Sequence, residues 1–142
     1  MIHLKQEHID QINRHAEKDY PHECCGIVFG LLSEEQSKAV TELLPISNSR
    51  EEQARHNRFL ITSEDIMRSE MYARKHKLDV LGFYHSHPDH PARPSAFDLE
   101  HAWPTYSYLI VAVAEGQAEE LTSWELNTDR SAFHSETIIR ED

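Results

Sequence analysis

The sequence predicts an α+β fold (mixed α/β), in which a single curved sheet is flanked by helices. Short apolar runs with the composition of buried strands recur along the 142 residues. Segments whose apolar residues recur at helical spacing lie between some of these runs. The two kinds of segment do not follow the strict strand–helix alternation of a parallel α/β sheet. At this length we expect one domain that spans residues 1–142.

Three helices are expected from apolar spacing and from residues that favour helix ends. In the segment 4–19 apolar side chains recur close to helical spacing, and Pro21 stops the helix. A second helix is expected over 62–76, because a hydroxyl side chain can cap its start and acidic residues occupy its first turn. Ser95 is expected to cap a third helix that ends near residue 102, since an acidic residue follows it three positions later.

The expected strands are short apolar or β-branched runs that turn residues separate from one another. They lie at residues 24–32, 39–45, 59–61, 82–85, 106–114, 119–126 and 132–139. The run YSYLIVAVA at 106–114 is the strongest of them, and the polar segment 47–56 is expected to be a loop.

The charge of the chain excludes several kinds of partner. Its 14 basic and 25 acidic side chains give a net charge of −11 with neutral histidines. Nucleic acids and anionic membrane surfaces are therefore not expected to bind, because both need clustered lysine and arginine. No apolar run is long enough to span a bilayer, and the N-terminal residues do not resemble a secretory signal. We expect a cytoplasmic protein.

The two cysteines, Cys24 and Cys25, are adjacent and predict no disulfide framework. Their neighbours are apolar, which indicates a buried strand. Alternation along a strand sends the two thiols to opposite faces, so at most one can point at a nearby site. Cys24 is considered as an adventitious metal ligand, and its role stays open.

The segment YHSHPDHPARPSAFD, residues 84–98, contains the residues most suited to metal chemistry. His85 and His87 are two apart, so on a strand both imidazoles point to one face. Asp98 follows eleven residues after His87, and the intervening prolines stiffen the connection. Two nitrogens and one oxygen suit Zn²⁺ and leave a fourth position for water, which is the pattern of catalytic zinc.

A purely structural explanation of these residues must be weighed against the metal site. The chain has 11 histidines, so some close pairs arise by chance, and a bare His-x-His is a weak signal. Ser95 and Asp98 alone would be taken for helix-capping residues. The four residues His85, His87, Ser95 and Asp98 together follow a predicted strand and lead into a predicted helix. This combined pattern is far more specific than the His-x-His pair or the capping pair alone.

The HSHP run at 85–88, followed by Ser95 and Asp98, resembles the motif of the JAMM (MPN-plus) metalloproteases. The PHECCG run at 21–26 resembles the upstream segment that carries the catalytic glutamate of that family. The resemblance covers nearly the whole chain, up to about residue 133, and is closest to the small prokaryotic stand-alone members. It implies the mostly antiparallel sheet of the JAMM/MPN (cytidine-deaminase-like) fold.

The resemblance also implies a role for each site residue. His85, His87 and Asp98 would hold Zn²⁺ as the cofactor. Glu23 would take a proton from the attacking water and pass it to the leaving amine. Ser95 would donate a hydrogen bond to the oxyanion that forms at the carbonyl. The implied protein is an enzyme, a zinc metallopeptidase that hydrolyses an amide bond.

From the residues alone, Glu23 is the least secure of these assignments. It is one of many acidic residues, and Asp89 and Glu100 lie nearer to the histidines in the sequence. Its position beside a buried strand favours it, but the assignment rests mainly on the resemblance. Asp89 and Glu100 therefore stay open as alternative general bases.

The short chain resembles family members that act on ubiquitin-like sulfur-carrier proteins. Their substrate is the C-terminal Gly-Gly tail of the carrier, from which some release an added residue such as cysteine. Glycine lets the backbone approach a metal closely. We therefore expect such a carrier as the partner, and family members also lead us to consider a homodimer.

Two alternatives remain. One is a non-catalytic MPN scaffold, although such scaffolds lack the histidines and the aspartate. The other is a JAMM hydrolase that acts on cell-wall peptides. A zinc deaminase is disfavoured because its combined pattern, His-x-Glu followed by Pro-Cys-x-x-Cys, is absent: the only cysteines are adjacent.

Overall fold

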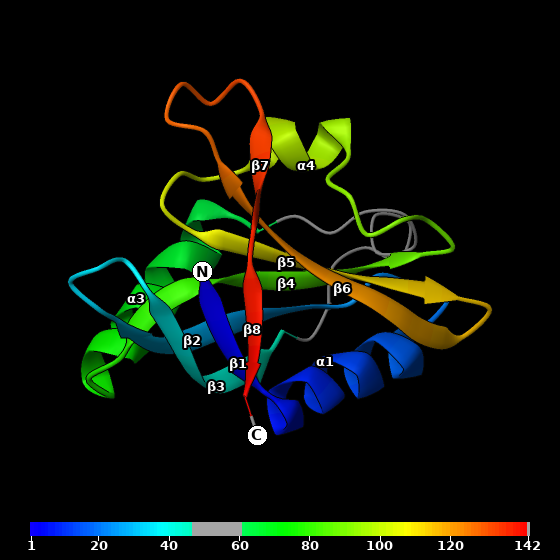
Figure 1. Ribbon diagram of the computed structural model, residues 1–142, viewed down its shortest axis with the longest axis horizontal. Coiled ribbons are helices and arrows are strands. Elements are labelled where there is room, and N and C mark those ends of the chain that lie inside the picture. Colours follow the sequence, from blue (N-terminus) through cyan, green and yellow to red (C-terminus); the bar gives the residue numbers. More distant parts are fainter. Residues whose placement is uncertain (47–60, 142) are drawn as a thin grey trace.

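Eight strands form one sheet in the computed structural model, which describes residues 1–46 and 61–141 (Figure 1). The strands are β1 (Ile2–Lys5), β2 (Cys25–Leu32), β3 (Lys38–Pro45), β4 (Asp79–Pro88), β5 (Ser107–Ala114), β6 (Gln117–Leu126), β7 (Phe133–Glu136) and β8 (Ile138–Glu141). The helices of the described residues are α1 (Gln6–Asp19), α3 (Ser63–Lys75) and α4 (Ala96–His101). None of these helices is long and apolar enough to cross a membrane.

The sheet is mixed, with the order β7-β6-β5-β4-β2-β3-β1-β8. Antiparallel pairs join β7 to β6, β6 to β5, β4 to β2 and β2 to β3. Parallel pairs join β4 to β5, β1 to β3 and β1 to β8. The predicted α+β class, a mostly antiparallel sheet with flanking helices, is confirmed.

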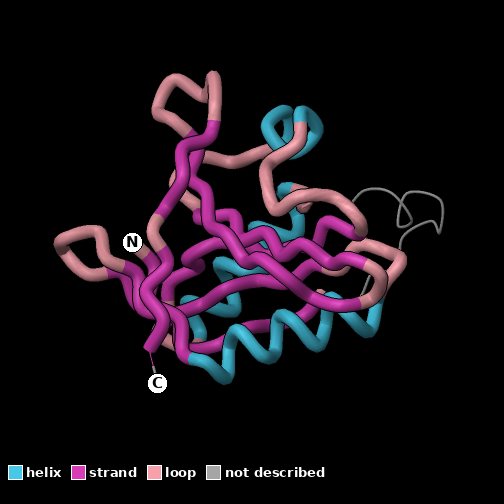
Figure 2. The backbone as a smooth tube through the Cα atoms, turned by 45° about the vertical axis from the view of Figure 1, so that its right-hand side comes forward, coloured by secondary structure: helices cyan, strands magenta, loops and turns pink. Residues whose placement is uncertain are grey.

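Side chains that alternate along the central strands build a core on each face of the sheet. Tyr84 and Val28 pack in the cluster that α1 covers, whereas Phe83 and Ile27 pack in the cluster that includes Ala73 of α3. In Figure 2, α1 runs along one side of the strands and α4 lies on the opposite side. The α3/α4 face is the one that carries the histidines of β4.

The sheet curls so that its two edge strands come together. β7 and β8 lie at opposite ends of the strand order, yet only Thr137 separates them along the chain (Figure 1). A buried ion cluster lies inside this curl. Lys38 Nζ on β3 is 3.1 Å from Glu136 Oε2 on β7 and 2.9 Å from Glu125 Oε2 on β6. Residues from both halves of the sheet therefore meet around one ammonium group.

Two predictions of secondary structure were wrong, and both concern strands at which the edges of the sheet come together. Leu4 belongs to β1 and not to the first helix, because Ile2 and Leu4 alternate into the core, where both are fully buried. The single strand expected at 132–139 is two strands, since the chain passes there from one sheet edge to the other. The strand expected at 59–61 lies almost wholly outside the described residues.

Candidate metal centre

The central strand β4 places two histidines on the α3/α4 face of the sheet. His85 pairs with Cys25 of β2 and with Ile110 of β5, and His87 pairs with Ala112 of β5. Ser86 between them faces the other way, and its Oγ accepts a 2.8 Å hydrogen bond from the backbone N–H of Cys24. Because β4 has a hydrogen-bonded neighbour on each side, both imidazoles project from backbone that the sheet holds in place.

The side chains of His85, His87 and Asp98 converge on one point. The Nε2 atoms of the two histidines are 3.2 Å apart, and Asp98 Oδ2 lies 3.2 Å from His87 Nε2 and 3.5 Å from His85 Nε2. Four ligands at about 2.0–2.1 Å around a tetrahedral metal would be about 3.3–3.4 Å apart. The observed triangle fits this spacing, and three ligand atoms leave the fourth corner for water or substrate.

The cap of α4 delivers the carboxylate to this point. The backbone N–H of Asp98 donates to Ser95 Oγ at 3.0 Å, and the backbone N–H of Ser95 donates to Asp98 Oδ2 at 2.8 Å. This reciprocal capping box fixes the aspartate at the start of the helix. Because the serine oxygen accepts the amide proton, the hydroxyl keeps its own proton for donation.

The proline-rich segment orients His87 through a backbone carbonyl. His87 Nδ1 lies 2.9 Å from the carbonyl oxygen of Pro91, which can only accept a hydrogen bond. Nδ1 must therefore carry a proton, so that the neutral ring has its Nε2 lone pair free for a metal ion, whereas the protonated ring can donate from Nε2 to Asp98. Metal-ligating histidines are oriented in this way in proteins generally. The sequence could not predict this contact, since every residue carries a carbonyl.

The electrostatics of the triangle suit a cation. Burial lowers the pKa of His87, but its hydrogen bonds to Asp98 and to the Pro91 carbonyl outweigh burial, so that the pKa is raised. Burial raises the pKa of Asp98, but hydrogen bonds from His85 and His87 outweigh it and hold the pKa well below its usual range. The carboxylate is therefore ionised, and the site favours positive charge between its three side chains.

Glu23 lies at the edge of the same site. It is half-buried, stands two residues before the Cys25–His85 pair, and lines a hollow of about 610 Å³ together with His87, Ser95 and Asp98. Of the two alternative bases, Glu100 also lines this hollow. Asp89 does not suit the role, because its carboxylate accepts hydrogen bonds from the Tyr20 hydroxyl at 2.7 Å and from the Glu115 N–H at 3.1 Å.

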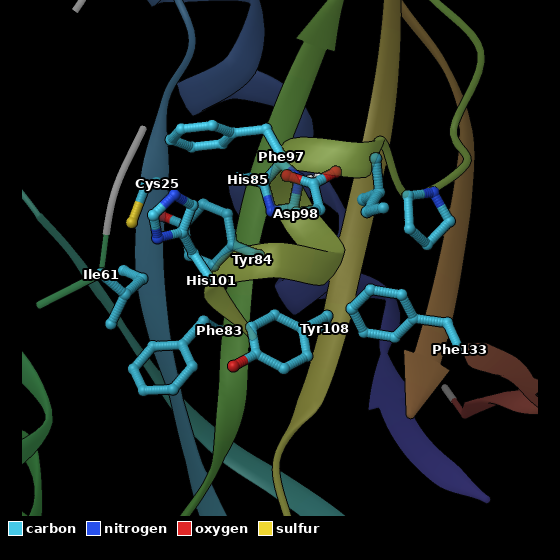
Figure 3. A pocket seen from close by; sticks show the side chains of 12 residues that line it. Cys25, Ile61, Phe83, Tyr84, His85, Phe97, Asp98, His101, Tyr108 and Phe133 are labelled. Atoms are coloured by element: carbon cyan, nitrogen blue, oxygen red, sulfur yellow. Dashed lines mark ion pairs between the residues drawn. The ribbon is translucent and has the colours of Figure 1, made fainter. Parts of the chain in front are cut away.

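A second, mainly apolar pocket lies on the other side of the triangle. Figure 3 shows His85 and Asp98 at its rim and the rings of Phe83, Tyr108 and Phe133 along its wall. Its free volume is about 30 Å³, which leaves room for about one water molecule. The triangle thus stands between a polar hollow and a nearly filled apolar pocket.

The two cysteines point to opposite faces, as the strand alternation predicts, but Cys25 is the one that faces the site. Cys25 lines the apolar pocket beside His85. Cys24 packs in the cluster under α1, and burial raises the pKa of its thiol to about 12. The possibility that Cys24 is an adventitious ligand, which the sequence left open, does not hold, because its side chain lies on the far face of the sheet.

The fold is that of the JAMM-type hydrolases, and the comparisons with known proteins place the chain in this class. The family model of prokaryotic homologs of the JAB domain matches residues 5–127, and the chain belongs to this family. The chain is 35% identical over 106 residues to a desampylase from Haloferax volcanii, a match that covers 71% of this chain and 73% of that protein. It is 34% identical over 95 residues to the tail tip assembly protein K of Escherichia phage N15. That match covers 67% of this chain but only 34% of the phage protein.

Solved structures share this fold. A solution structure of a Salinibacter ruber protein is 44% identical, with a TM-score of 0.76, and the match covers 100% of this chain and 92% of that one. A JAB1/MPN domain protein from Archaeoglobus fulgidus has a TM-score of 0.60 at 17% identity over 100% of this chain and 98% of its own. At that identity the likeness concerns the fold alone.

Proposed function

We propose that the protein is a zinc-dependent metallopeptidase or isopeptidase. In this proposal it hydrolyses an amide bond at the C-terminal Gly-Gly tail of a ubiquitin-like sulfur-carrier protein. The observation that carries the proposal is the triangle of His85, His87 and Asp98, whose spacing suits a tetrahedral ion with one open position. Histidine nitrogens with one carboxylate oxygen favour zinc over magnesium or calcium, which prefer oxygen ligands.

Glu23 and Ser95 have separate roles in the proposed reaction. A bound zinc would supply an acidic water and an electrophile for the carbonyl oxygen. Glu23 takes the proton of the water as its oxygen attacks the carbonyl carbon, and gives the proton to the amine nitrogen as the C–N bond breaks. Ser95 donates its hydroxyl proton to the carbonyl oxygen while negative charge develops there.

The relation to a desampylase supports a ubiquitin-like protein as the substrate class. A tail that ends in glycines also suits the site physically. Glycine has no Cβ, so its carbonyl can approach the partly buried triangle more closely than that of any other residue. A folded carrier body would stay outside, and only the extended tail would enter the hollow.

Metal content and cleavage together test the proposal. Protein purified without chelator or histidine tag should hold about one zinc per chain, and the His85→Ala/His87→Ala double variant should hold none. The metal-loaded protein should cut a purified sulfur carrier that bears a C-terminal adduct. A zinc-loaded protein that leaves this adduct intact would contradict the substrate assignment but not the metal site. Zinc held equally by the double variant would contradict the metal site itself.

A second candidate is a hydrolase of cell-wall peptides, which we consider because one relative is a phage tail tip assembly protein. The chain matches about a third of that protein, so the relation concerns one part of it only. Peptides derived from peptidoglycan, offered in the same assay, separate the two candidates. The scaffold alternative is less favoured, because the three candidate ligands are present and converge. A homodimer stays a prediction, which sedimentation equilibrium would test.

A further inference from the structure

The polar hollow beside the candidate metal centre contains one permanently charged cation. Among the described residues that line it, Arg93 is the only lysine or arginine, and Glu23 and Glu100 are the carboxylates that accompany Asp98 there. Arg93 was not predicted as a site residue. Its signal in the sequence is that no other lysine or arginine lies between His85 and Asp98.

The backbone that carries Arg93 is held on both sides. The Ala92 side chain is 1% exposed, and the Ala92 carbonyl accepts a 2.6 Å hydrogen bond from Thr122 Oγ1. The Arg93 N–H donates to the Pro91 carbonyl at 2.8 Å, and Pro91 is the residue whose carbonyl orients His87. Pro94 fixes φ immediately afterwards. The start of the arginine side chain is therefore fixed relative to the metal triangle.

The guanidinium is available to a ligand. Arg93 is exposed and forms no ion pair with any residue of the described part of the chain. A planar guanidinium offers two parallel N–H donors to a carboxylate, which a lysine cannot do. Without it, an anion entering the hollow would meet Glu23 and Glu100, in a chain whose net charge is −11. A site for an anionic group in this hollow therefore depends on Arg93.

The hollow lies on the side of the leaving group. Glu23 gives its proton to the leaving amine in the proposed reaction, so that amine must lie beside Glu23. Arg93 lines the same hollow as Glu23, whereas the apolar pocket on the other side of the triangle shares only Phe97 and Asp98 with it. A residue released by hydrolysis would thus leave through the hollow that contains the guanidinium.

We propose that Arg93 binds the free α-carboxylate of a single amino acid attached to the C-terminus of the tail. This inference rests on the proposed function and narrows its substrate. Water adds its oxygen to the last glycine carbonyl, the C–N bond breaks, and the amine takes the proton. The products are a tail that ends in a carboxylate and one free amino acid. An isopeptide-linked lysine side chain presents no α-carboxylate at this place, so Arg93 favours removal of a terminal residue over deconjugation.

Equilibrium binding to a cleavage-deficient protein tests the inference without relying on activity. The zinc-loaded Glu23→Gln variant is titrated calorimetrically with two ten-residue tail peptides that end in Gly-Gly-Ala, one as the free acid and one as the carboxamide. The acid should bind at least tenfold more tightly than the amide. Adding Arg93→Gln should reduce binding of the acid to that of the amide and leave the amide unchanged. Arg74→Gln, which removes an exposed arginine of α3, is the charge-matched control and should change neither.

Kinetics of the otherwise unmodified protein supply a second measurement. Arg93→Gln should raise KM for the acid peptide about tenfold with little change in kcat, and Arg93→Lys should recover part of this loss. The arginine also borders a second hollow that contains Glu120. If acid and amide bind equally, or Arg93→Gln weakens both equally, the guanidinium serves that other hollow and the inference is overturned while the proposed function stands. If neither peptide binds and no carrier adduct is cut, the proposed function fails and the inference fails with it.

Discussion

Replacing Lys38 by methionine should destabilise the protein strongly, although the residue is far from the candidate active site. The Lys38 side chain is 7% exposed and that of Glu136 is 1% exposed. Lys38 Nζ is within hydrogen-bond distance of Glu136, Glu125 and Ser107, and these partners come from β7, β6 and β5. Methionine fills a similar volume but leaves the Glu136 carboxylate buried without this ammonium group.

The size of the effect follows from the loss of the buried cation that lies closest to Glu136. Removing one partner of a buried ion pair costs about 3–5 kcal/mol, mostly because the other charge stays desolvated. The hydroxyls of Ser107 and Ser123 still donate to Glu136 Oε1 at 2.6 and 2.7 Å, and the Met1 amino group lies 3.6 Å from Glu136 Oε2, so the lower half of this range is more reasonable. For a chain of this length, 3–4 kcal/mol corresponds to a fall in Tm of roughly 10–15 °C.

Urea denaturation of Lys38→Met, Glu136→Gln and the double variant measures this directly. The double variant should recover most of the stability lost in Lys38→Met, because no charge is then buried without a partner. A loss below 1 kcal/mol in Lys38→Met would refute the reasoning. So would a double variant no more stable than Lys38→Met, since the cost would then arise from packing and not from charge.

Three further variants test the site and its support. Glu23→Gln should retain zinc but lose about 10²–10⁴-fold in hydrolysis, because only the proton carrier is removed; metal analysis beside a cleavage assay checks this. Gly26→Ala should lower the free energy of unfolding by about 1–3 kcal/mol in thermal denaturation, since a Cβ there would lie 2.1 Å from the ring of Tyr84. Burial lowers the pKa of His15, so its contribution to stability is present above pH 6.5 and is lost as pH falls through the folded-state pKa. The His15→Gln variant should therefore lose less stability between pH 7 and pH 5 than the unmodified protein, with the remaining dependence due partly to His8, whose pKa burial also lowers.

The sequence was most informative where structure depends on neighbours along the chain. The strand at 106–114 is apolar throughout, and β5 occupies nearly the same residues. The capping pair Ser95 and Asp98 is a local signal, and it begins α4 as expected. Consecutive candidate ligands are at most eleven residues apart, so strand alternation and a helix start were enough to predict that they could meet.

The sequence was least informative where structure depends on distant partners. β1 has four residues, and its place in the sheet comes from parallel pairing with β3 and with β8 at the other end of the chain. Lys38 follows the polar run SEEQS and resembles the solvated start of a strand. Its burial follows only from the curl of the sheet, which no local pattern encodes. The same holds for Cys25, whose direction depends on the register between β2 and β4.

The prolines of the segment 84–98 act together with contacts from distant strands. They cannot bring Asp98 back to the histidines unaided, because a stiff segment can be stiff in the wrong direction. Contacts from distant strands fix that direction: Thr122 of β6 holds the Ala92 carbonyl, and Glu115 after β5 donates its N–H to Asp89. With the segment held in this way, the Pro91 carbonyl orients His87, and Arg93 and Ser95 line the same hollow. The segment loses its conformational entropy when the sheet folds. The free energy of binding a metal ion or a tail therefore does not have to offset this loss.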